Sequence, residues 1–187
     1  MLGASGRRVN VVEAGHGTEN TPEAEVGAAG TNDALGSAEA LTLADDGAGG
    51  MQGFVLSRLS APGDVDYYSF DTTAGQVIGV VCRSARGGSG VTGLTVSLRD
   101  GADAELAMDV ETATDNAVIM DYAPSAAGTF YLRLSKTGQD ATVTGDWVRC
   151  GVHTGPPAAP SAGAGTTHPS GAPPGSAAAT SSRRRRS

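Results

Sequence analysis

The sequence predicts an all-β fold: an antiparallel β-sandwich of about eight strands, similar to a jelly roll, with disordered termini. Apolar and polar side chains alternate through residues 51–152, which is the period of strands with one buried face. Glycine-rich turns separate these runs at a spacing of roughly 10–12 residues, as in all-β sandwiches. No helical pattern falls between the runs, which argues against a parallel α/β sheet.

The runs carry apolar rows that we expect to face a common interior. These rows are Phe54 and Leu56; Ile78, Val80 and Cys82; Leu94, Val96 and Leu98; Leu106, Met108 and Val110; Val118, Met120 and Tyr122; Phe130, Leu132 and Leu134; and Val148, Cys150 and Val152. In the run that begins at Asp64, we expect Val65 and Tyr67 on one face and Tyr68 and Phe70 on the other. Two layers closed over such an interior leave no room for an active-site cleft.

Composition divides the chain into three parts. Residues 1–22 show no periodicity and are predicted to be a flexible lead-in, and residues 23–154 are predicted to form the sandwich domain. Residues 155–187 are rich in Pro, Ala, Gly and Ser, and we expect a disordered tail there. The four arginines at 183–186 are either a basic anchor or address, or, as we favour, the end of a solvated tail.

The net charge of the chain limits the classes of molecule that it can bind. The formal net charge is −7, and four of the 13 basic residues are the arginines at 183–186. The rest of the chain therefore sets nine basic side chains against 20 acidic ones, which repels nucleic acid and suits divalent cations. No apolar run approaches the roughly 18 residues that a membrane span needs. Residues 1–8 lack the apolar core of a signal peptide, so we expect a piece of a longer precursor.

The two cysteines, Cys82 and Cys150, both fall on predicted inward rows. They form either a disulfide, worth roughly 2–4 kcal/mol if the two strands are adjacent, or two buried free thiols. We favour the disulfide, because an even number of cysteines in a glycine-rich β protein is typical of an oxidising compartment.

One stretch resembles a known family. Residues 63–70 read Gly-Asp-Val-Asp-Tyr-Tyr-Ser-Phe, which is similar to the Gly-Asp-x-Asp-Tyr-Tyr motif of the bacterial pre-peptidase C-terminal domain. The opening Asn-Asp segment at 32–41, the Ala-Gly-Gln turn at 74–77 and the Gly-Thr-Phe-Tyr strand at 128–133 follow the family's order. The likeness extends over about residues 23–152. Residues 26–31 depart from it, since they separate two groups that are nearly adjacent in the family.

The resemblance implies a jelly-roll-like sandwich that is not itself a catalyst. Its members are commonly appended to secreted bacterial peptidases, and some relatives bind collagen or polysaccharide.

The resemblance also implies a calcium site. Six residues offer the hard oxygen donors that Ca²⁺ prefers: Glu23, Glu25, Asn32, Asp33, Asp64 and Asp66. Asp64 and Asp66 are two residues apart at the start of a strand, so their side chains point to the same face. They share an ion if the opening segment folds back on this strand. In the alternative, Asp64 closes a Pro-Gly-Asp turn and Asp66 is solvated.

Nothing in the sequence predicts catalysis. None of the histidines, His16, His153 and His168, has a metal-ligand or catalytic spacing. Among the aromatic residues outside the apolar rows, we expect Tyr67 and Trp147 in the core. We expect Tyr131 to be exposed and able to contact a ligand.

These observations favour a non-catalytic accessory module of a secreted bacterial protein, a peptidase or another hydrolase, located outside the cell or on its surface. Such a module aids folding, secretion or attachment to substrate, and its partner is the adjacent catalytic domain. The alternatives are a stand-alone module that binds extracellular polysaccharide or a collagen-like protein, and a structural domain of a surface protein.

Overall fold

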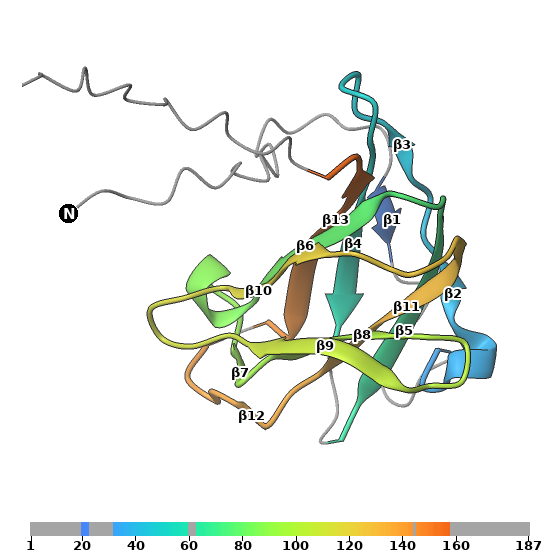
Figure 1. Cartoon of the computed structure of the whole chain (residues 1–187). Coiled ribbons are helices and arrows are strands. Elements are labelled where there is room, and N and C mark those ends of the chain that lie inside the picture. Colours follow the sequence, from blue (N-terminus) through green and yellow to red (C-terminus); the bar gives the residue numbers. More distant parts are fainter. Residues whose placement is uncertain (1–19, 23–31, 60–62, 144, 158–187) are drawn as a thin grey trace, which may run out of the picture.

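The described part of the chain forms two main β-sheets packed face to face, together with a small two-stranded sheet (Figure 1). The computed structural model describes residues 20–22, 32–59, 63–143 and 145–157. Eight strands of five or more residues carry the fold within these ranges: β4 (Met51–Arg58), β5 (Val65–Thr72), β6 (Val77–Arg83), β8 (Thr95–Arg99), β9 (Glu105–Val110), β10 (Ala117–Tyr122), β11 (Gly128–Ser135) and β13 (Trp147–Gly155). The shorter elements are β1 (Asn20–Pro22), β2 (Glu39–Ala40), β3 (Ala44–Asp45), β7 (Val91–Thr92) and β12 (Gly138–Gln139), with the 3-10 turns η1 (Leu35–Ser37) and η2 (Ala85–Gly87).

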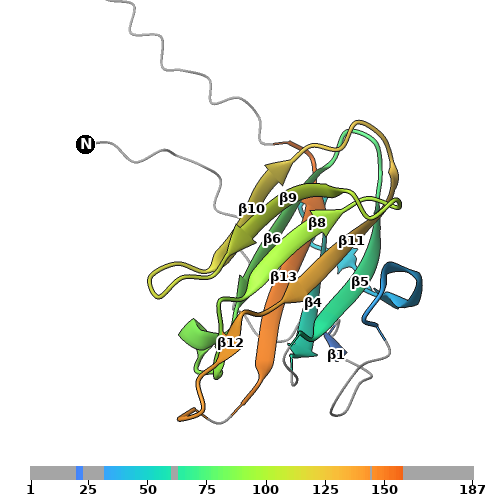
Figure 2. The same ribbon diagram turned by 90° about the horizontal axis from the view of Figure 1, so that it is seen from below.

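The strand order is that of a jelly roll. The first sheet runs β1-β4-β13-β6-β10, with β3 also paired to β4, and the second runs β2-β5-β11-β8-β9. The first long strand therefore pairs with the last, and the second with the seventh, as two Greek keys require. Figure 2 shows the two layers from below. The predicted all-β antiparallel sandwich is confirmed.

Four of the predicted apolar rows line the interior. Ile78, Val80 and Cys82 of β6, the row Leu94, Val96 and Leu98, the β11 row and the β13 row are all buried in one continuous core. Tyr68 and Phe70 of β5 join them. In the runs of β8, β11 and β13 the opposite face carries no aliphatic residue, so the alternation is decisive. The opposite face of β6 does carry Val77 and Val81, and there the pairing of Cys82 with Cys150 identifies the inward face.

The row predicted for β4 faces the wrong way. Val55, Ser57 and Leu59 point inward and are at most 1% exposed, whereas Leu56 is 46% exposed. Both faces of this run carry apolar residues, so alternation alone does not choose between them. Pairing with β13 decides, because Cys150 lies opposite Val55.

The rows predicted for β9 and β10 are also largely wrong. Met108 and Met120 are 51% and 47% exposed. On β10 an irregularity lies between Ile119 and Tyr122, where Asp121 has a φ of 49°. This bulge reverses the alternation, so that Ile119 is buried and Tyr122 still packs against the core.

The limits of the domain differ slightly from the prediction. Asn20–Pro22, predicted as lead-in, forms a strand parallel to β4, and β13 continues to Gly155. Most of the predicted lead-in and of the predicted tail lies outside the described residues. Within the part of the chain that the structure describes, no helix is long and apolar enough to cross a membrane.

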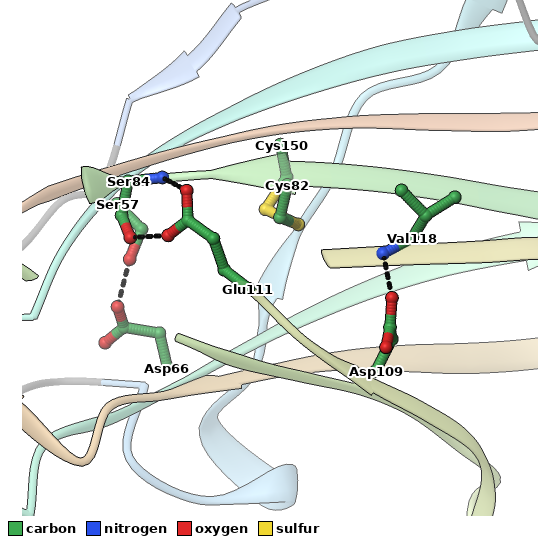
Figure 3. The surroundings of a disulfide bond; sticks show 8 residues. All are labelled: Ser57, Asp66, Cys82, Ser84, Asp109, Glu111, Val118 and Cys150. Atoms are coloured by element: carbon green, nitrogen blue, oxygen red, sulfur yellow. Dashed lines mark hydrogen bonds between the residues drawn. A yellow bond between two sulfur atoms is a disulfide. The ribbon is translucent and has the colours of Figure 1, made fainter. Parts of the chain in front are cut away.

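A disulfide joins Cys82 of β6 to Cys150 of β13 (Figure 3). The two residues are direct cross-strand partners with Cα atoms 4.1 Å apart, and both are fully buried. The bond closes a loop across a sequence separation of 68 residues. It therefore restricts the unfolded chain substantially, as a link between distant residues does.

Removing this bond should destabilise the fold. We expect Cys82→Ala combined with Cys150→Ala to lower the free energy of unfolding by about 4 kcal/mol, from the loop-closure entropy for this separation. Urea unfolding followed by circular dichroism measures the change. A reducing agent should lower the stability of the wild-type protein toward that of the variant and leave the variant unchanged. Equal stability of the variant and the oxidised wild type would contradict this account.

Candidate cation site

Three carboxylates converge where the chain enters the sandwich. One oxygen each of Asp33, Asp64 and Asp66 lies within 4.8 Å of the other two. Asp33 is exposed, whereas Asp64 and Asp66 are only 5% and 0% exposed. The alternative in which Asp66 is solvated is therefore wrong.

The alternation of β5 explains why these carboxylates are buried. Asp64 and Asp66 lie on the same face as Tyr68 and Phe70, which is the core face. Inside the sandwich, the hydroxyl of Ser57 on β4 donates a hydrogen bond to Oδ2 of Asp66 (Figure 3). The carboxyl group of Asp66 thus lies between the two sheets, and the exposed Asp33 approaches it from the surface.

The opening segment folds back along β5, as the predicted site requires. Residues Glu39 and Ala40 of β2 pair in parallel with Tyr68 and Ser69. Further upstream, the Tyr67 N–H donates to the Asn32 carbonyl oxygen at 2.9 Å, and Nδ2 of Asn32 donates to the Tyr67 carbonyl oxygen at 3.4 Å. These bonds hold Asn32, and with it Asp33, against the strand that carries Asp66.

Asn32, which precedes Asp33 in the sequence, offers a further oxygen. Its side chain is fully buried, and its Oδ1 accepts no hydrogen bond from any described residue. Burying an amide oxygen in this state costs about 1–3 kcal/mol, unless something else binds it. An amide oxygen next to carboxylates is a typical ligand of Ca²⁺.

The donor set fits a hard divalent cation. Asn32, Asp33, Asp64 and Asp66 offer oxygen atoms alone, which suit Ca²⁺ or Mg²⁺ better than the metals that prefer sulfur or imidazole. Three carboxylates this close repel one another, and two of them are withdrawn from water. A bound cation offsets both costs. Glu23 and Glu25, the other two predicted ligands, lie outside the described residues.

Sequence reasoning did not identify Ser57 as part of this site. A signal was present, because Ser57 interrupts the row formed by Val55 and Leu59 with a hydroxyl. A polar residue at an inward position needs a hydrogen-bond partner, and here that partner is Asp66.

Outside this cluster, two titratable side chains, His153 and Asp46, form a hydrogen-bonded pair. His153 Nε2 lies 3.0 Å from Asp46 Oδ2, and Asp46 Oδ1 accepts the N–H groups of Ala48 and Gly50 at 2.7 and 2.9 Å. Burial raises the pKa of the Asp46 carboxyl, but these hydrogen bonds and the charge of His153 outweigh it, so the pKa falls below its ordinary value.

The His153 ring is packed against backbone. A Cβ added to Gly50 would lie 2.7 Å from Nε2, and one added to Gly155 would lie 2.7 Å from Cε1. The pair thus anchors the β3–β4 turn to the end of β13. His16 and His168 lie outside the described residues.

The aromatic residues outside the core rows occupy the outer faces of the sheets. Tyr67 is buried, at 6% exposed, but beneath Arg133 on the outer face of the second sheet. Trp147 is half-buried on the outer face of the first sheet, where it lines a groove, so its predicted place in the core is wrong. Tyr131 is partly exposed, and its contact with a ligand stays a prediction.

Together, fold and site define a disulfide-linked jelly-roll domain with an acidic, oxygen-rich cluster at one end of its interior. Comparison with protein-family models finds no match, and comparison with curated protein sequences finds none either. A solved structure of Aeromonas hydrophila PliG, a periplasmic lysozyme inhibitor of g-type lysozyme, matches with a TM-score of 0.39 and 10% sequence identity. The match covers 73% of this chain and 97% of that chain. A likeness this weak carries no argument for function.

The Asp46–His153 pair predicts a dependence of stability on acid pH. Because the pKa of Asp46 is lower in the folded state, its carboxylate stabilises the fold above the ordinary value of 3.8. That contribution disappears as the pH falls through the lower folded-state value. We expect thermal melting at pH 7 and pH 3 to differ less for Asp46→Asn than for the wild type.

The neighbouring Asp45→Asn provides a matched loss of charge and should keep the pH dependence of the wild type. If Asp46→Asn and Asp45→Asn change the pH dependence equally, the pair has no specific role.

Proposed function

We propose that this chain is a non-catalytic accessory module of a secreted bacterial protein, and that Ca²⁺ stabilises its fold. The observation that carries the proposal is the convergence of Asp33, Asp64 and Asp66 within 4.8 Å, and the adjacent residue Asn32 adds a buried Oδ1 that accepts no hydrogen bond from any described residue. Two of these residues belong to the entry segment and two to the start of β5. An ion held between them fastens the chain leading into the domain to the sandwich.

The ion acts by mass action. Its ligands come from segments about 30 residues apart in sequence, which separate on unfolding, so the ion binds the folded form far better. A ligand that binds only the folded state at 100 times its dissociation constant adds about 2.7 kcal/mol of stability. Extracellular modules commonly bind Ca²⁺ in the range of 10⁻⁴–10⁻³ M, which matches a site with few protein ligands.

The disulfide supports the extracytoplasmic location. A buried bond between Cys82 and Cys150 is typical of proteins that fold in oxidising compartments. The assignment to an accessory module, attached to a peptidase or another hydrolase, rests on the resemblance of residues 63–70 to the pre-peptidase C-terminal domain. The packing of His153 against Asp46 and backbone supports a structural role for this histidine.

Calcium should raise the melting temperature of the full chain. In excess Ca²⁺ we expect a midpoint roughly 5–10 °C above that in EDTA, measured by differential scanning calorimetry. Asp64→Asn should abolish the gain. Asp71→Asn removes the same charge from an exposed position on the same strand and should retain it.

Stability measured without calcium distinguishes a cation site from a cluster of carboxylates that only supports the fold. Because Asp64→Asn removes like-charge repulsion, this variant should be at least as stable in EDTA as the wild type. An unchanged wild-type midpoint with Ca²⁺, or an equal gain with Mg²⁺, would overturn the calcium assignment. Hydrolytic activity that stays with the purified wild-type chain would overturn the non-catalytic assignment.

A further inference from the structure

A groove lies on the outer face of the first sheet, on the side of the sheet turned away from the core. It has a volume of about 770 Å³ and follows the end of β4, the end of β6 and the start of β13. Its lining includes Arg58, Arg83, Arg86, Arg149 and Trp147. Four guanidinium groups and an indole ring thus share one concave surface.

The strand register explains how these side chains come together. Trp147 lies opposite Arg58, and Arg149 lies between Leu56 on β4 and Arg83 on β6. These positions alternate with the buried residues of the same strands, so all of them face outward. The row crosses two strand spacings, about 10 Å.

The groove is rich in positive charge, whereas the domain as a whole is acidic. Residues 32–157 hold seven basic and 16 acidic side chains, and four of the seven basic ones line this groove. Asp146 is the acidic residue in the lining, and its Oδ1 accepts a hydrogen bond from Nε of Arg58 at 3.0 Å. Like charges placed opposite each other, as in Arg83 and Arg149, destabilise a sheet. The pairing of Arg83 with Arg149 concentrates positive charge in the groove, which favours a negatively charged ligand.

A buried carboxylate fixes the rim of the groove. Glu111 is 5% exposed, and its carboxylate accepts the N–H groups of Ser84, Ala85 and Arg86 at 2.9–3.2 Å. The Ser84 hydroxyl also donates to it (Figure 3). These bonds hold the turn η2, which carries Arg86. The guanidinium group of Arg86 therefore projects from a backbone that is already ordered.

The indole ring of Trp147 is also held in place, by packing against two glycines. A Cβ added to Gly87 would lie 2.5 Å from Cη2 of Trp147, and one added to Gly145 would lie 3.2 Å from Cδ1. Backbone on both sides therefore touches the ring. The η2 turn is fixed by Glu111, and the Trp147 ring is fixed by this packing. The aromatic ring and the neighbouring arginines are therefore preorganised for binding.

We propose that this groove binds an acidic polysaccharide, with its carboxylates on the arginines and a sugar ring stacked on Trp147. The planar guanidinium group matches a carboxylate with two parallel hydrogen bonds. The apolar face of a sugar ring can stack on the part of the indole that lines the groove. The inference is independent of the proposed calcium site, which lies on the inner side of β4.

The surroundings favour a saccharide over other polyanions. The groove lies over β4, β13 and β6, and β13 is paired on both sides, so a peptide cannot add to it as an extra strand. Single-stranded nucleic acid stacks successive bases on several aromatic side chains, whereas this lining has Trp147 alone.

The test uses the full chain and polygalacturonate, with its methyl-esterified form as the matched neutral ligand. Isothermal titration calorimetry at low and high salt should show binding of the acid form that salt weakens and no binding of the ester. Arg83→Gln with Arg149→Gln should weaken binding at least tenfold. Trp147→Ala should weaken it several-fold.

Two control variants distinguish binding in the groove from binding to positive charge elsewhere on the chain. Arg133→Gln removes a positive charge from the outer face of the second sheet, and replacing the four arginines at 183–186 by serine removes the basic end of the chain. Both should bind as the wild type does, and all variants should keep the circular dichroism spectrum of the wild type.

Several results would overturn the proposal. They are no binding of polygalacturonate, equal binding of the ester, equal loss in Arg133→Gln, or loss only when the arginines at 183–186 are replaced. Tighter binding of poly-glutamate or of a single-stranded oligonucleotide would assign the groove to an acidic peptide or to nucleic acid instead. If Arg83→Gln with Arg149→Gln fails to fold, the fold of Trp147→Ala and its loss of affinity decide the outcome.

Discussion

The register of β13 against its two neighbours controls both faces of the first sheet. On the inner face, Cys150 lies between Val55 and Cys82, which closes the core and permits the disulfide. On the outer face, Arg149 lies between Leu56 and Arg83. A slip of β13 by one residue would exchange its two faces and would put the guanidinium group of Arg149 into the core. Because the disulfide fixes this register covalently, it also fixes the composition of the groove.

The alternation that makes β4 a strand also separates two charged surfaces. Ser57 points inward and binds Asp66 of the acidic cluster, whereas its neighbours Leu56 and Arg58 point outward and line the groove. One short segment therefore touches the cluster on one side and the arginines on the other. The backbone of β4 lies between the two sets of side chains.

Local pattern identified the inward face wherever only one face of a run is apolar, and it was not decisive where both faces are. The rows of β11 and β13 were predicted correctly, because their opposite faces carry no aliphatic residue. The row of β6 was also predicted correctly, although Val77 and Val81 lie on its other face. On β4 the choice of face comes from a partner nearly a hundred residues away, and on β10 it comes from a bulge at Asp121. Neither constraint is visible in the run itself.

The same limit applies to the sites. Spacing placed Asp64 and Asp66 on one face, but only the paired sheets show that it is the core face. The arginines of the groove are scattered along the chain, and only the pairing of β4, β13 and β6 brings them together.

The short strand β1 has a consequence for the solubility of the molecule. Asn20–Pro22 pairs with residues 54–56, and β3 pairs with residues 51–52 of the same strand. Between them they occupy the outer hydrogen-bonding edge of β4, which would otherwise offer unpaired backbone groups to another chain. Pro22 at the new border cannot donate a hydrogen bond there. Loss of β1 would leave β3 in place and expose the edge of β4 at residues 54–56, where unpaired backbone groups can pair with a second copy and start aggregation.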